Sequence, residues 1–208
     1  ADVSISVDCG SAKQLGSVQN AFFRSKTTVQ VDHHDFGDAF GKVMVIDEEA
    51  SAVGEIVFDL LRALKIEITP AIATCLLTSI IVDTGAFRFS NIRPRTFDIC
   101  SRLIRKGVDL QHLIEESYWL KSRAAARLSG YAVQRAKFLA EGRLSYTWLT
   151  RKDFVRFKAK MSDTDGVADE LGCIEGGKSA AVLRQAEDRG IRVSLRSSSG
   201  INVANIAR

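Results

Sequence analysis

The chain has 208 residues, of which 46% are hydrophobic and 26% charged, and this composition excludes a disordered, collagenous or coiled-coil protein. The formal net charge of +4 suits a protein that meets anionic ligands, but it is too small to identify a nucleic-acid binder. The four cysteines are far apart and form no C-x-x-C pair, and no apolar run is long enough for a membrane span. We therefore expect a cytoplasmic protein with free thiols and no membrane partner.

The first half of the chain predicts strands that alternate with helices. Three β-rich segments, residues 3–8, 27–32 and 78–83, each end in an aspartate. Apolar residues recur every 3.6 positions over residues 52–63, and Pro70 begins a further helix over 71–77 that leads into the third strand. This alternation predicts an α/β fold with a mostly parallel sheet. Because ligands bind beyond the carboxyl ends of parallel strands, we expect all three aspartates at one sheet edge.

The second half predicts a smaller domain. Residues 118–142 have the composition of a connecting helix. After it come an alternating strand at 144–149, an acidic helical stretch at 162–171, and a hairpin of 180–187 with 191–197 around Asp188-Arg189-Gly190. We therefore expect a first domain over 1–117, a connecting helix over 118–142 and a smaller α/β domain over 143–208.

Asp32-His33-His34 is the strongest chemical signal in the chain. Consecutive side chains of an extended segment point to opposite sides, so we expect one histidine to bind metal and the other to face substrate. Carboxylates and imidazole without thiolate favour Mn²⁺ or Mg²⁺ over a structural zinc. Clustered carboxylates also need a cation to compensate their charge. Two ions held in this way hydrolyse phosphoesters.

Three motifs at these predicted strand ends resemble the DHH phosphoesterase superfamily: Val7-Asp8-Cys9-Gly10, Asp32-His33-His34 and the segment 81–89. Residues 52–55 and 191–198 resemble its RecJ-like branch, and within that branch the bacterial bifunctional oligoribonucleases and pAp phosphatases (nanoRNases). The resemblance implies two Mn²⁺ ions, with Mg²⁺ as an alternative, and a second domain that binds substrate across a cleft. It also implies hydrolysis of short RNA or DNA oligonucleotides, or of nucleotide phosphates such as 3′-phosphoadenosine 5′-phosphate.

The resemblance further implies roles for single residues. Asp8, His33 and Asp83 would bind metal, Asp32 would orient the histidine pair, and His34 would face the scissile phosphate. The substrate-binding residues would be Arg88, Arg196 and Ser197. Members of the family also carry a His and Asp-x-Asp motif that would precede Ala1 and a Gly-rich His segment that would follow Arg208. We therefore expect both domains to be incomplete, and we assign activity to the longer parent protein, with a homodimer as one assembly.

Alternative functions remain open from the sequence. Within the superfamily they are a cyclic-dinucleotide or linear dinucleotide phosphodiesterase and a single-strand exonuclease. From a different class, an inactive nucleotide-binding remnant would also fit the absence of the first motif.

Two further patterns give expectations that a structure can test. The segment 172–179 matches the G-x-x-x-x-G-K-[ST] phosphate loop, but that loop needs a strand before it, and the acidic residues 163–171 do not predict one. We interpret this match as accidental. Along 191–196, apolar residues alternate with Arg192, Ser194 and Arg196, so we expect Arg196 on a polar face away from the core.

Overall fold

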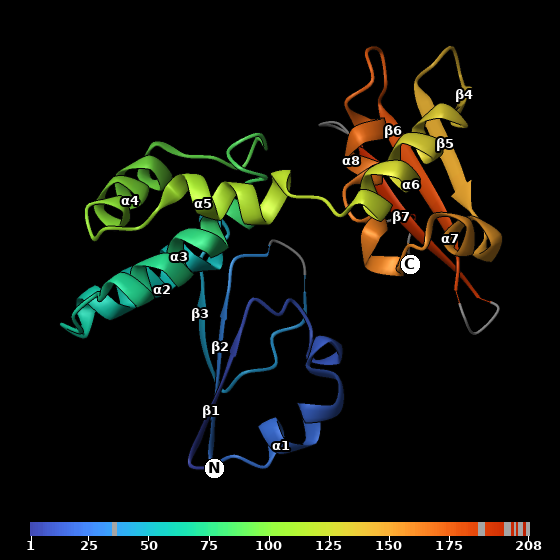
Figure 1. Cartoon of the computed structure of the whole chain (residues 1–208). Coiled ribbons are helices and arrows are strands. Elements are labelled where there is room, and N and C mark those ends of the chain that lie inside the picture. The colour runs from blue at the N-terminus through green and yellow to red at the C-terminus, as the bar shows by residue number, and fades with distance from the viewer. Residues whose placement is uncertain (35–36, 187–189, 198–200, 202, 204–205, 207–208) are drawn as a thin grey trace. The chain divides into compact units, whose positions relative to one another are not determined.

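The chain folds into two compact units, Ala1–Leu120 and Lys121–Arg208, each with its own sheet (Figure 1). A computed structural model describes all residues except 35–36, 187–189, 198–200, 202, 204–205 and 207–208. Among the described residues, no helix is both long enough and apolar enough to cross a membrane.

The sheet of the first unit is small and entirely parallel, as the alternation of strands and helices predicts. Its strands follow the order β1 (Val3–Val7), β2 (Thr27–Asp32) and β3 (Val43–Ile46). Val31 of the central strand pairs with Val7 on one side and with Val45 on the other. The predicted strands that precede Asp8 and Asp32 are confirmed, whereas β3 is too short for the sequence pattern to predict. A 3₁₀ segment (Ala12–Val18) and α1 (Gln19–Phe23) join β1 to β2.

Helix α2 (Val53–Ala63) connects the sheet to the rest of the unit, and its predicted extent is confirmed. Val53 and Ile56 belong to a core cluster with Val31 of β2. Another face, with Phe58, belongs to the cluster that includes α3, and Gly54 brings the two helices together. A Cβ at Gly54 would lie 2.9 Å from the carbonyl oxygen of Leu76, so any larger residue would push α2 away from α3.

Helix α3 (Pro70–Asp83) corrects the sequence prediction, because residues 78–83 are helical and not a third strand. The helix begins as expected, with Pro70 in its first turn and the Thr69 hydroxyl accepting a hydrogen bond from the Ile72 N–H at 3.3 Å. The run that suggested a strand is apolar because α3 is buried on several sides. Leu77, Ile80 and Ile81, for example, are 0% exposed. Short apolar runs do not distinguish a buried helix from a buried strand.

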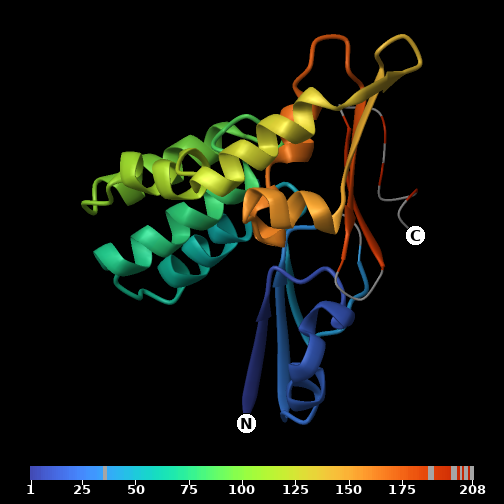
Figure 2. The same cartoon turned by 45° about the vertical axis from the view of Figure 1, so that its right-hand side comes forward.

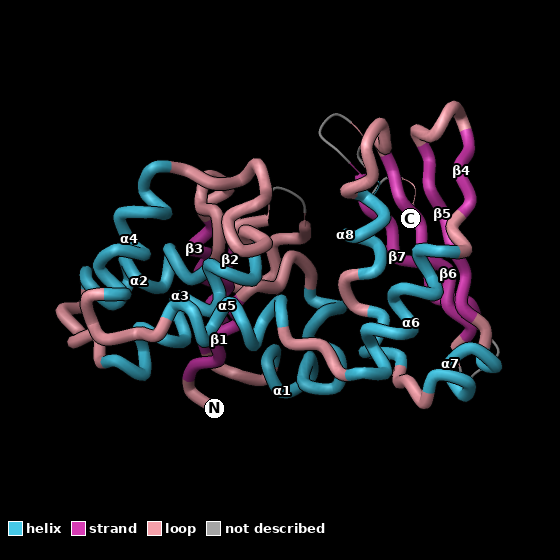
Figure 3. The backbone as a smooth tube through the Cα atoms, turned by 45° about the horizontal axis from the view of Figure 1, so that its top comes forward, coloured by secondary structure: helices cyan, strands magenta, loops and turns pink. Residues whose placement is uncertain are grey.

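The remaining helices of the first unit complete the same core. Helices α2, α3, α4 and α5 lie side by side in Figures 1 and 3, and residues of all four belong to one core cluster. Their later members are α4 (Pro94–Ile104), α5 (Leu110–Ile114) and a π-helical turn (Glu115–Trp119). Tyr118 of that turn donates a hydrogen bond of 2.9 Å to the carbonyl oxygen of Val82, which fixes the turn against the end of α3.

The second unit is a four-stranded mixed sheet with helices on one face (Figure 2). The strand order is β4 (Lys137–Leu139), β5 (Leu144–Leu149), β6 (Ser179–Gln185) and β7 (Ile191–Ser197), and only β5 and β6 are parallel. The other elements are α6 (Arg123–Gln134), α7 (Arg151–Phe157), a 3₁₀ turn (Met161–Thr164) and α8 (Val167–Gly172). Leu128, Val167 and Val182 lie at the centre of this core.

The segment 118–142, expected to form one connecting helix, is divided among several elements. The helix α6 covers only Arg123–Gln134, and residues 137–139 form strand β4 instead. Leu128 and Ala132 of α6 are fully buried in the core of the second unit. The helix therefore packs as part of the second unit.

Two predictions for the C-terminal part of the second unit are confirmed: the hairpin of β6 with β7, and the interpretation of the phosphate-loop match at 172–179 as accidental. Strands β6 and β7 pair antiparallel, while residues 187–189 of the expected turn lie outside the described residues. Helix α8 precedes the segment 172–179 and strand β6 follows it, which reverses the strand–loop–helix order that a phosphate loop needs.

The face of β7 that lies on the side of the helices is the polar one, opposite to the expectation from the sequence. Ser194 pairs with Val182 and Arg196 with Ala180, and both of those β6 residues are buried under the helices. The prediction that Arg196 points away from the core face is therefore wrong. The other face of β7 carries Ile191 and Val193, which are more than half exposed, so the apolar residues of this strand do not mark the core.

Candidate metal centre

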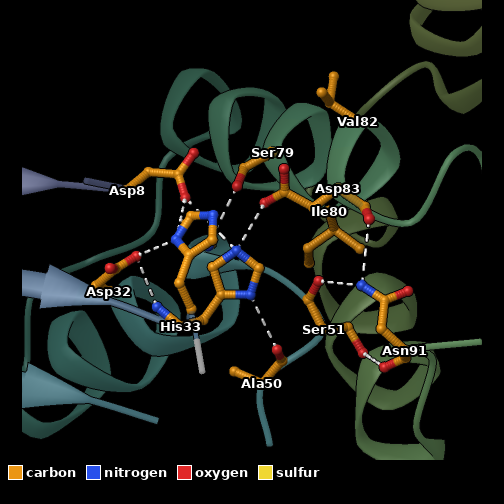
Figure 4. A network of polar contacts seen from close by, with 12 residues as sticks. Asp8, Asp32, His33, Ala50, Ser51, Ser79, Ile80, Val82, Asp83 and Asn91 are labelled. Atoms are coloured by element: carbon orange, nitrogen blue, oxygen red, sulfur yellow. Dashed lines mark hydrogen bonds and ion pairs between the residues drawn. The ribbon is translucent and has the colours of Figure 1, made fainter. Parts of the chain in front are cut away.

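Asp8 follows directly after β1 and has a left-handed backbone, with φ of 60°. Its backbone N–H donates a hydrogen bond of 3.0 Å to the carbonyl oxygen of Val31, which continues the pairing of β1 with β2. Aspartate is one of the few residues that tolerate this conformation. The turn aims the partly exposed Asp8 carboxylate at the end of β2 (Figure 4).

Asp32 closes β2 and is buried, with its carboxylate directed at the histidines that follow it. Its Oδ1 atom accepts a hydrogen bond of 2.9 Å from the His33 backbone N–H and lies 2.7 Å from Nδ1 of His34. A buried carboxylate in this position holds the ring of His34 in one orientation. The structure thus places Asp32 where an orienting residue would have to be.

His33 is oriented by the backbone of the segment before α2. Its Nδ1 atom lies 3.1 Å from the carbonyl oxygen of Ala50. Since a carbonyl can only accept, Nδ1 carries the proton, and Nε2 of the neutral ring presents its lone pair. That Nε2 atom lies 3.5 Å from Asp8 Oδ1 and 3.8 Å from Asp83 Oδ2. An imidazole in this tautomer, with a carbonyl behind it, is typical of a metal ligand.

The two histidine rings lie on the same side of the chain, which corrects the expectation that they point apart. Their centroids are 4.8 Å from each other. The chain has left β2 at this point, so the alternation of an extended strand no longer applies. Ligand atoms from Asp8, His33 and His34 all lie within 4.8 Å of one another, and each could contribute to a metal site.

Asp83 reaches the same place from the last residue of α3 and not from a strand (Figure 4). Its Oδ2 atom is buried and has no hydrogen-bond partner among the described residues. Burial raises the pKa of Asp83, and repulsion from Asp8 raises it further, although the two histidines and the Val53 N–H act in the opposite direction. Two carboxylates facing each other with one oxygen unsatisfied are the electrostatic signature of a site that needs a cation.

The donor set therefore fits a divalent metal ion. It consists of carboxylate oxygens and imidazole nitrogen without sulfur, a combination suited to Mn²⁺ or Mg²⁺. The three predicted metal ligands, Asp8, His33 and Asp83, are all brought together, and Asp32 and His34 lie beside them.

Asn91 is a supporting residue that sequence reasoning missed. Its amide donates hydrogen bonds to the backbone oxygen of Asp83 at 3.2 Å and to that of Ser51 at 2.9 Å. The Ser51 hydroxyl in turn donates to the backbone carbonyl oxygen of Asn91 at 2.7 Å. This lock ties the end of α3 to the residues before α2. Its only sequence signal is a single amide residue in the loop before Pro94.

Gln30 is a second missed residue, and it connects the loops on either side of the site. Its side chain is 2% exposed in the middle of β2. The amide group donates to the Cys9 carbonyl oxygen at 3.1 Å, and the amide oxygen accepts from the N–H of Phe40 at 3.1 Å and of Gly41 at 3.4 Å. The sequence signal for such a role is weak, because Gln30 is one of several polar residues in the segment Thr27–Asp32.

The predicted substrate-binding residues divide between the two units. Arg88 is exposed in the first unit, and its guanidinium donates to the Gly85 carbonyl oxygen at 2.7 Å and lies 5.2 Å from the ring centroid of Tyr118. It follows a turn in which Gly85, Ala86 and Phe87 all have positive φ values of 55–65°. Such a left-handed run is rare and costs about 1–2 kcal/mol for each residue other than glycine.

Arg196 and Ser197 belong to β7 in the second unit. Arg196 donates a hydrogen bond of 2.5 Å from Nε to Oδ1 of Asp169 on α8. The Ser197 hydroxyl donates one of 2.6 Å to the carbonyl oxygen of Ile201. Both side chains therefore have partners within their own unit.

Comparison with known families identifies the first unit. Residues 2–80 match the profile described as DHH family, N-terminal domain. The match includes Asp8, Asp32 and both clustered histidines, and it ends three residues before Asp83.

Curated relatives extend the similarity over most of the chain. The bifunctional oligoribonuclease and PAP phosphatase NrnA of Thermus thermophilus is 31% identical over 179 residues, which are 86% of this chain and 53% of that protein. The enzyme of the same name from Bacillus subtilis is 26% identical and is matched over 91% of this chain and 60% of its own length. A cyclic-di-AMP phosphodiesterase, GdpP of Geobacillus thermodenitrificans, is 26% identical over 89% of this chain and 28% of its own. The chain thus spans little more than half the length of the NrnA relatives.

One solved structure shares the fold over the whole chain. It is an exopolyphosphatase-related protein from Bacteroides fragilis, with a TM-score of 0.93, 24% identity and coverage of 100% of this chain and 62% of that one. At this identity the likeness concerns the fold alone.

Proposed function

The chain belongs to the DHH family, and from this premise we propose that it is part of a Mn²⁺-dependent hydrolase that cleaves the phosphoester bonds of short oligonucleotides and of 3′-phosphoadenosine 5′-phosphate. The observation that carries the proposal is the cluster of Asp8, His33, His34 and Asp83 with an unsatisfied carboxylate oxygen at its centre. The similarity to two NrnA enzymes supports the choice of substrates.

Asp8, His33 and Asp83 would hold the metal, with His34 within reach of the same position. Bound there, divalent ions supply an activated water molecule and neutralise the charge that develops on the phosphoryl group. Mn²⁺ is proposed over Mg²⁺ because an imidazole is part of the donor set, which suits a transition metal better than the harder Mg²⁺.

The histidine pair divides two tasks in this proposal. The Ala50 carbonyl fixes the proton of His33 on Nδ1, so this residue presents only Nε2 and serves as a ligand. Asp32 holds Nδ1 of His34, so Nε2 of that ring is the atom that faces the scissile phosphate and exchanges a hydrogen bond or a proton with it. Asn91 keeps Asp83 in place through the end of α3.

Substrate binding is proposed for Arg88 in the first unit and for Arg196 and Ser197 in the second. A guanidinium can grip a phosphate through two parallel hydrogen bonds. Asp169 accepts a hydrogen bond from Nε of Arg196, and the Leu195 carbonyl oxygen accepts one of 3.1 Å from Nη1. These two contacts hold the guanidinium in a fixed orientation, in which Nη2 would meet an anion. A homodimer is the assembly that we propose for the complete protein.

The test is hydrolysis by the natural full-length protein with Mn²⁺, Mg²⁺ or EDTA present. We expect cleavage of a diribonucleotide and release of phosphate from 3′-phosphoadenosine 5′-phosphate with Mn²⁺, and none with EDTA. Asp8→Asn should abolish both activities, whereas Asp98→Asn, at an exposed position on α4, should not change them. Hydrolysis that survives EDTA and Asp8→Asn would contradict the proposal, and a protein that binds nucleotide without cleaving it would be an inactive remnant.

A second candidate substrate is a cyclic dinucleotide, favoured by the similarity to GdpP. Cyclic-di-AMP and its linear product belong in the same assay. If the cyclic compound is cleaved faster than the diribonucleotide, this alternative replaces the first. If single strands longer than ten nucleotides are degraded fastest, the protein is an exonuclease of the same family.

A further inference from the structure

The second unit contains a pocket of about 680 Å³ that takes no part in the proposed hydrolysis. It lies between α7, the segment that follows α7, and the ends of β6 and β7 that lie away from Arg196. Its lining includes four basic residues, Arg151, Lys158, Lys160 and Arg192, and two larger apolar residues, Phe154 and Met161. A cavity of this size is in the range that holds a small organic ligand, roughly 300–1,000 Å³.

The charge of the lining selects the class of ligand. None of the described residues that line the pocket is a carboxylate, while Lys158, Lys160 and Arg192 are all exposed cations. Cations gathered around a concave surface attract an anion, because the low-dielectric walls concentrate their field. Arginine in particular offers the fork of donors that matches a phosphate.

The apolar side of the pocket indicates that the anion carries a hydrophobic group. Phe154 is half-buried against the core of the second unit, and Met161 is a half-buried part of the same lining. An aromatic ring that borders a cavity is a surface on which a base can stack, and a thioether adapts its shape to a ring. A bare inorganic anion would leave this surface without a partner.

The backbone around the pocket is held in place by local hydrogen bonds. The Gln185 side chain on β6 accepts a hydrogen bond of 3.2 Å from the N–H of Arg151, which ties the first turn of α7 to the sheet. At the other end of α7, Lys158 has a left-handed φ of 52° and the Ala159 N–H donates to the Phe154 carbonyl oxygen at 2.9 Å. The backbone that carries these cations is therefore ordered before a ligand binds, which lowers the entropy cost of binding.

We propose that this pocket is a nucleotide-binding site, distinct from the metal centre, in which Lys158, Lys160 and Arg192 hold the phosphate and Phe154 with Met161 hold the base. The site is also separate from Arg196, which lies four residues further along β7 with its guanidinium on Asp169. The ligand is a 5′-nucleotide, either free or at the end of a short chain. This proposal goes beyond the proposed hydrolysis and does not depend on it, because no residue of the pocket belongs to the metal centre.

The experiment is a titration of the ¹⁵N-labelled full chain, followed by amide chemical shifts, with EDTA present so that no metal ion can hold nucleotide elsewhere. The probes are adenosine 5′-monophosphate, inorganic phosphate, adenosine and a 5′-phosphorylated diribonucleotide. We expect the monophosphate to shift amides of α7, Lys160 and Arg192 and to bind at least fivefold more tightly than phosphate or adenosine alone. The diribonucleotide shows whether the end of a chain enters as well as the free nucleotide does.

Two variants make the assignment specific. The pair Lys160→Gln and Arg192→Gln, which removes two cations of the lining, should weaken monophosphate binding about tenfold or more, the scale of a lost charge-assisted hydrogen bond. Lys152→Gln removes an exposed cation of the same helix outside the lining and should change binding less than twofold. Shifts that are absent at millimolar monophosphate would overturn the proposal. Equal weakening by both variants would do so too, because it would indicate a diffuse basic surface.

Discussion

The two units differ in how their buried and half-buried carboxylates are satisfied. In the second unit three carboxylates have partners: Arg135 lies 3.3 Å from Asp153, Arg196 binds Asp169, and Glu170 meets Lys121 and Ser129. The one buried side-chain atom without a hydrogen-bond partner among the described residues of this unit is Nε of Arg184. In the first unit, buried oxygen atoms of Glu55, Asp83 and Asn91 have no hydrogen-bond partner among the described residues. Each such group costs about 1–3 kcal/mol, so a fold retains it only where something else depends on it.

We interpret this difference as stability that is given up for the proposed metal site. Asp83 and Asp8 repel each other in the absence of a cation, and the pKa of Asp83 is raised by burial and by that repulsion. Asp153 is also buried, yet its pKa lies below the usual value, because hydrogen bonds from Thr150 and the charge of Arg135 outweigh the effect of burial. The first carboxylate keeps an unsatisfied oxygen, which suits the metal ligand that we propose, and the second is satisfied by the protein itself.

The largest expected effect follows from removing the unsatisfied carboxylate. Asp83→Ala in the natural full-length protein should lower Mn²⁺-dependent hydrolysis at least about a hundredfold, because a lost ligand removes both water activation and charge neutralisation. The metal-free protein should keep its thermal stability or gain some, because a repulsive buried charge is lost. Calorimetric titration with Mn²⁺ and thermal melts in EDTA measure the two effects. A variant that melts much earlier in EDTA would show that Asp83 supports the fold, and the contrast between the units would then be wrong.

A smaller effect, of about tenfold, is expected for Arg196→Lys. Lysine keeps the charge but cannot reproduce the two parallel hydrogen bonds of a guanidinium on phosphate. The KM for a short oligonucleotide should rise about tenfold, whereas hydrolysis of a small generic phosphodiester should barely change. Arg196 is 53% exposed at its side chain, so its pair with Asp169 adds little stability and the melting temperature should stay the same. Equal losses on both substrates would indicate that Arg196 acts in the chemical step or supports the fold. An unchanged KM would indicate that Arg196 does not bind substrate and only pairs with Asp169.

The sequence predicted which side chains come together better than it predicted the elements that carry them. The aspartates stood out because each ends a β-rich segment, and the resemblance to the DHH phosphoesterases then implied that Asp8, His33 and Asp83 bind metal. The strand assigned to residues 78–83 failed because a helix buried on several sides loses its 3.6-residue contrast. The wrong face of β7 has a related cause, since Ser194 and Arg196 lie on the face of the sheet that the helices cover and make polar contacts there in place of apolar ones. Neither the left-handed backbone of Asp8 nor the lock by Asn91 has a local pattern that could reveal it.

Asp153 tests the comparison from the second unit, where the carboxylate is satisfied by hydrogen bonds within the protein. Its Oδ2 atom accepts hydrogen bonds of 2.7 Å from both the N–H and the hydroxyl of Thr150, which caps α7. Asp153→Asn should lower the free energy of unfolding by about 1–2 kcal/mol at pH 7, as loss of a helix cap and of a charged partner does. Because the pKa of Asp153 is lowered on folding, this stabilisation is present above the usual value of 3.8 and disappears as the pH falls below it.

Denaturant unfolding at pH 7 and at successively lower pH measures the effect, with the exposed Asp165→Asn as a control that should change nothing. If the wild type and Asp153→Asn differ by the same amount below pH 3, the carboxylate charge is not the source of the stability.

The smallest expected effect concerns backbone strain, which both units contain. Ala86 in the first unit and Ala140 in the second have left-handed φ values of 55° and 52°. Ala140 is exposed in the turn between β4 and β5, so Ala140→Gly should raise the free energy of unfolding by about 0.5–1 kcal/mol and leave hydrolysis unchanged. Ala86 belongs to the turn after Asp83 and packs against the first core, so the relief of strain in Ala86→Gly is partly offset by the lost methyl group.

We expect Ala86→Gly to have nearly wild-type stability and a several-fold lower kcat, because a more flexible turn holds Arg88 and the end of α3 less firmly. Denaturant unfolding and steady-state kinetics, run on both variants in parallel, separate the two outcomes. If both substitutions raise stability equally and neither affects kcat, the left-handed turn beside the metal centre is an ordinary turn, and strain does not distinguish the two units.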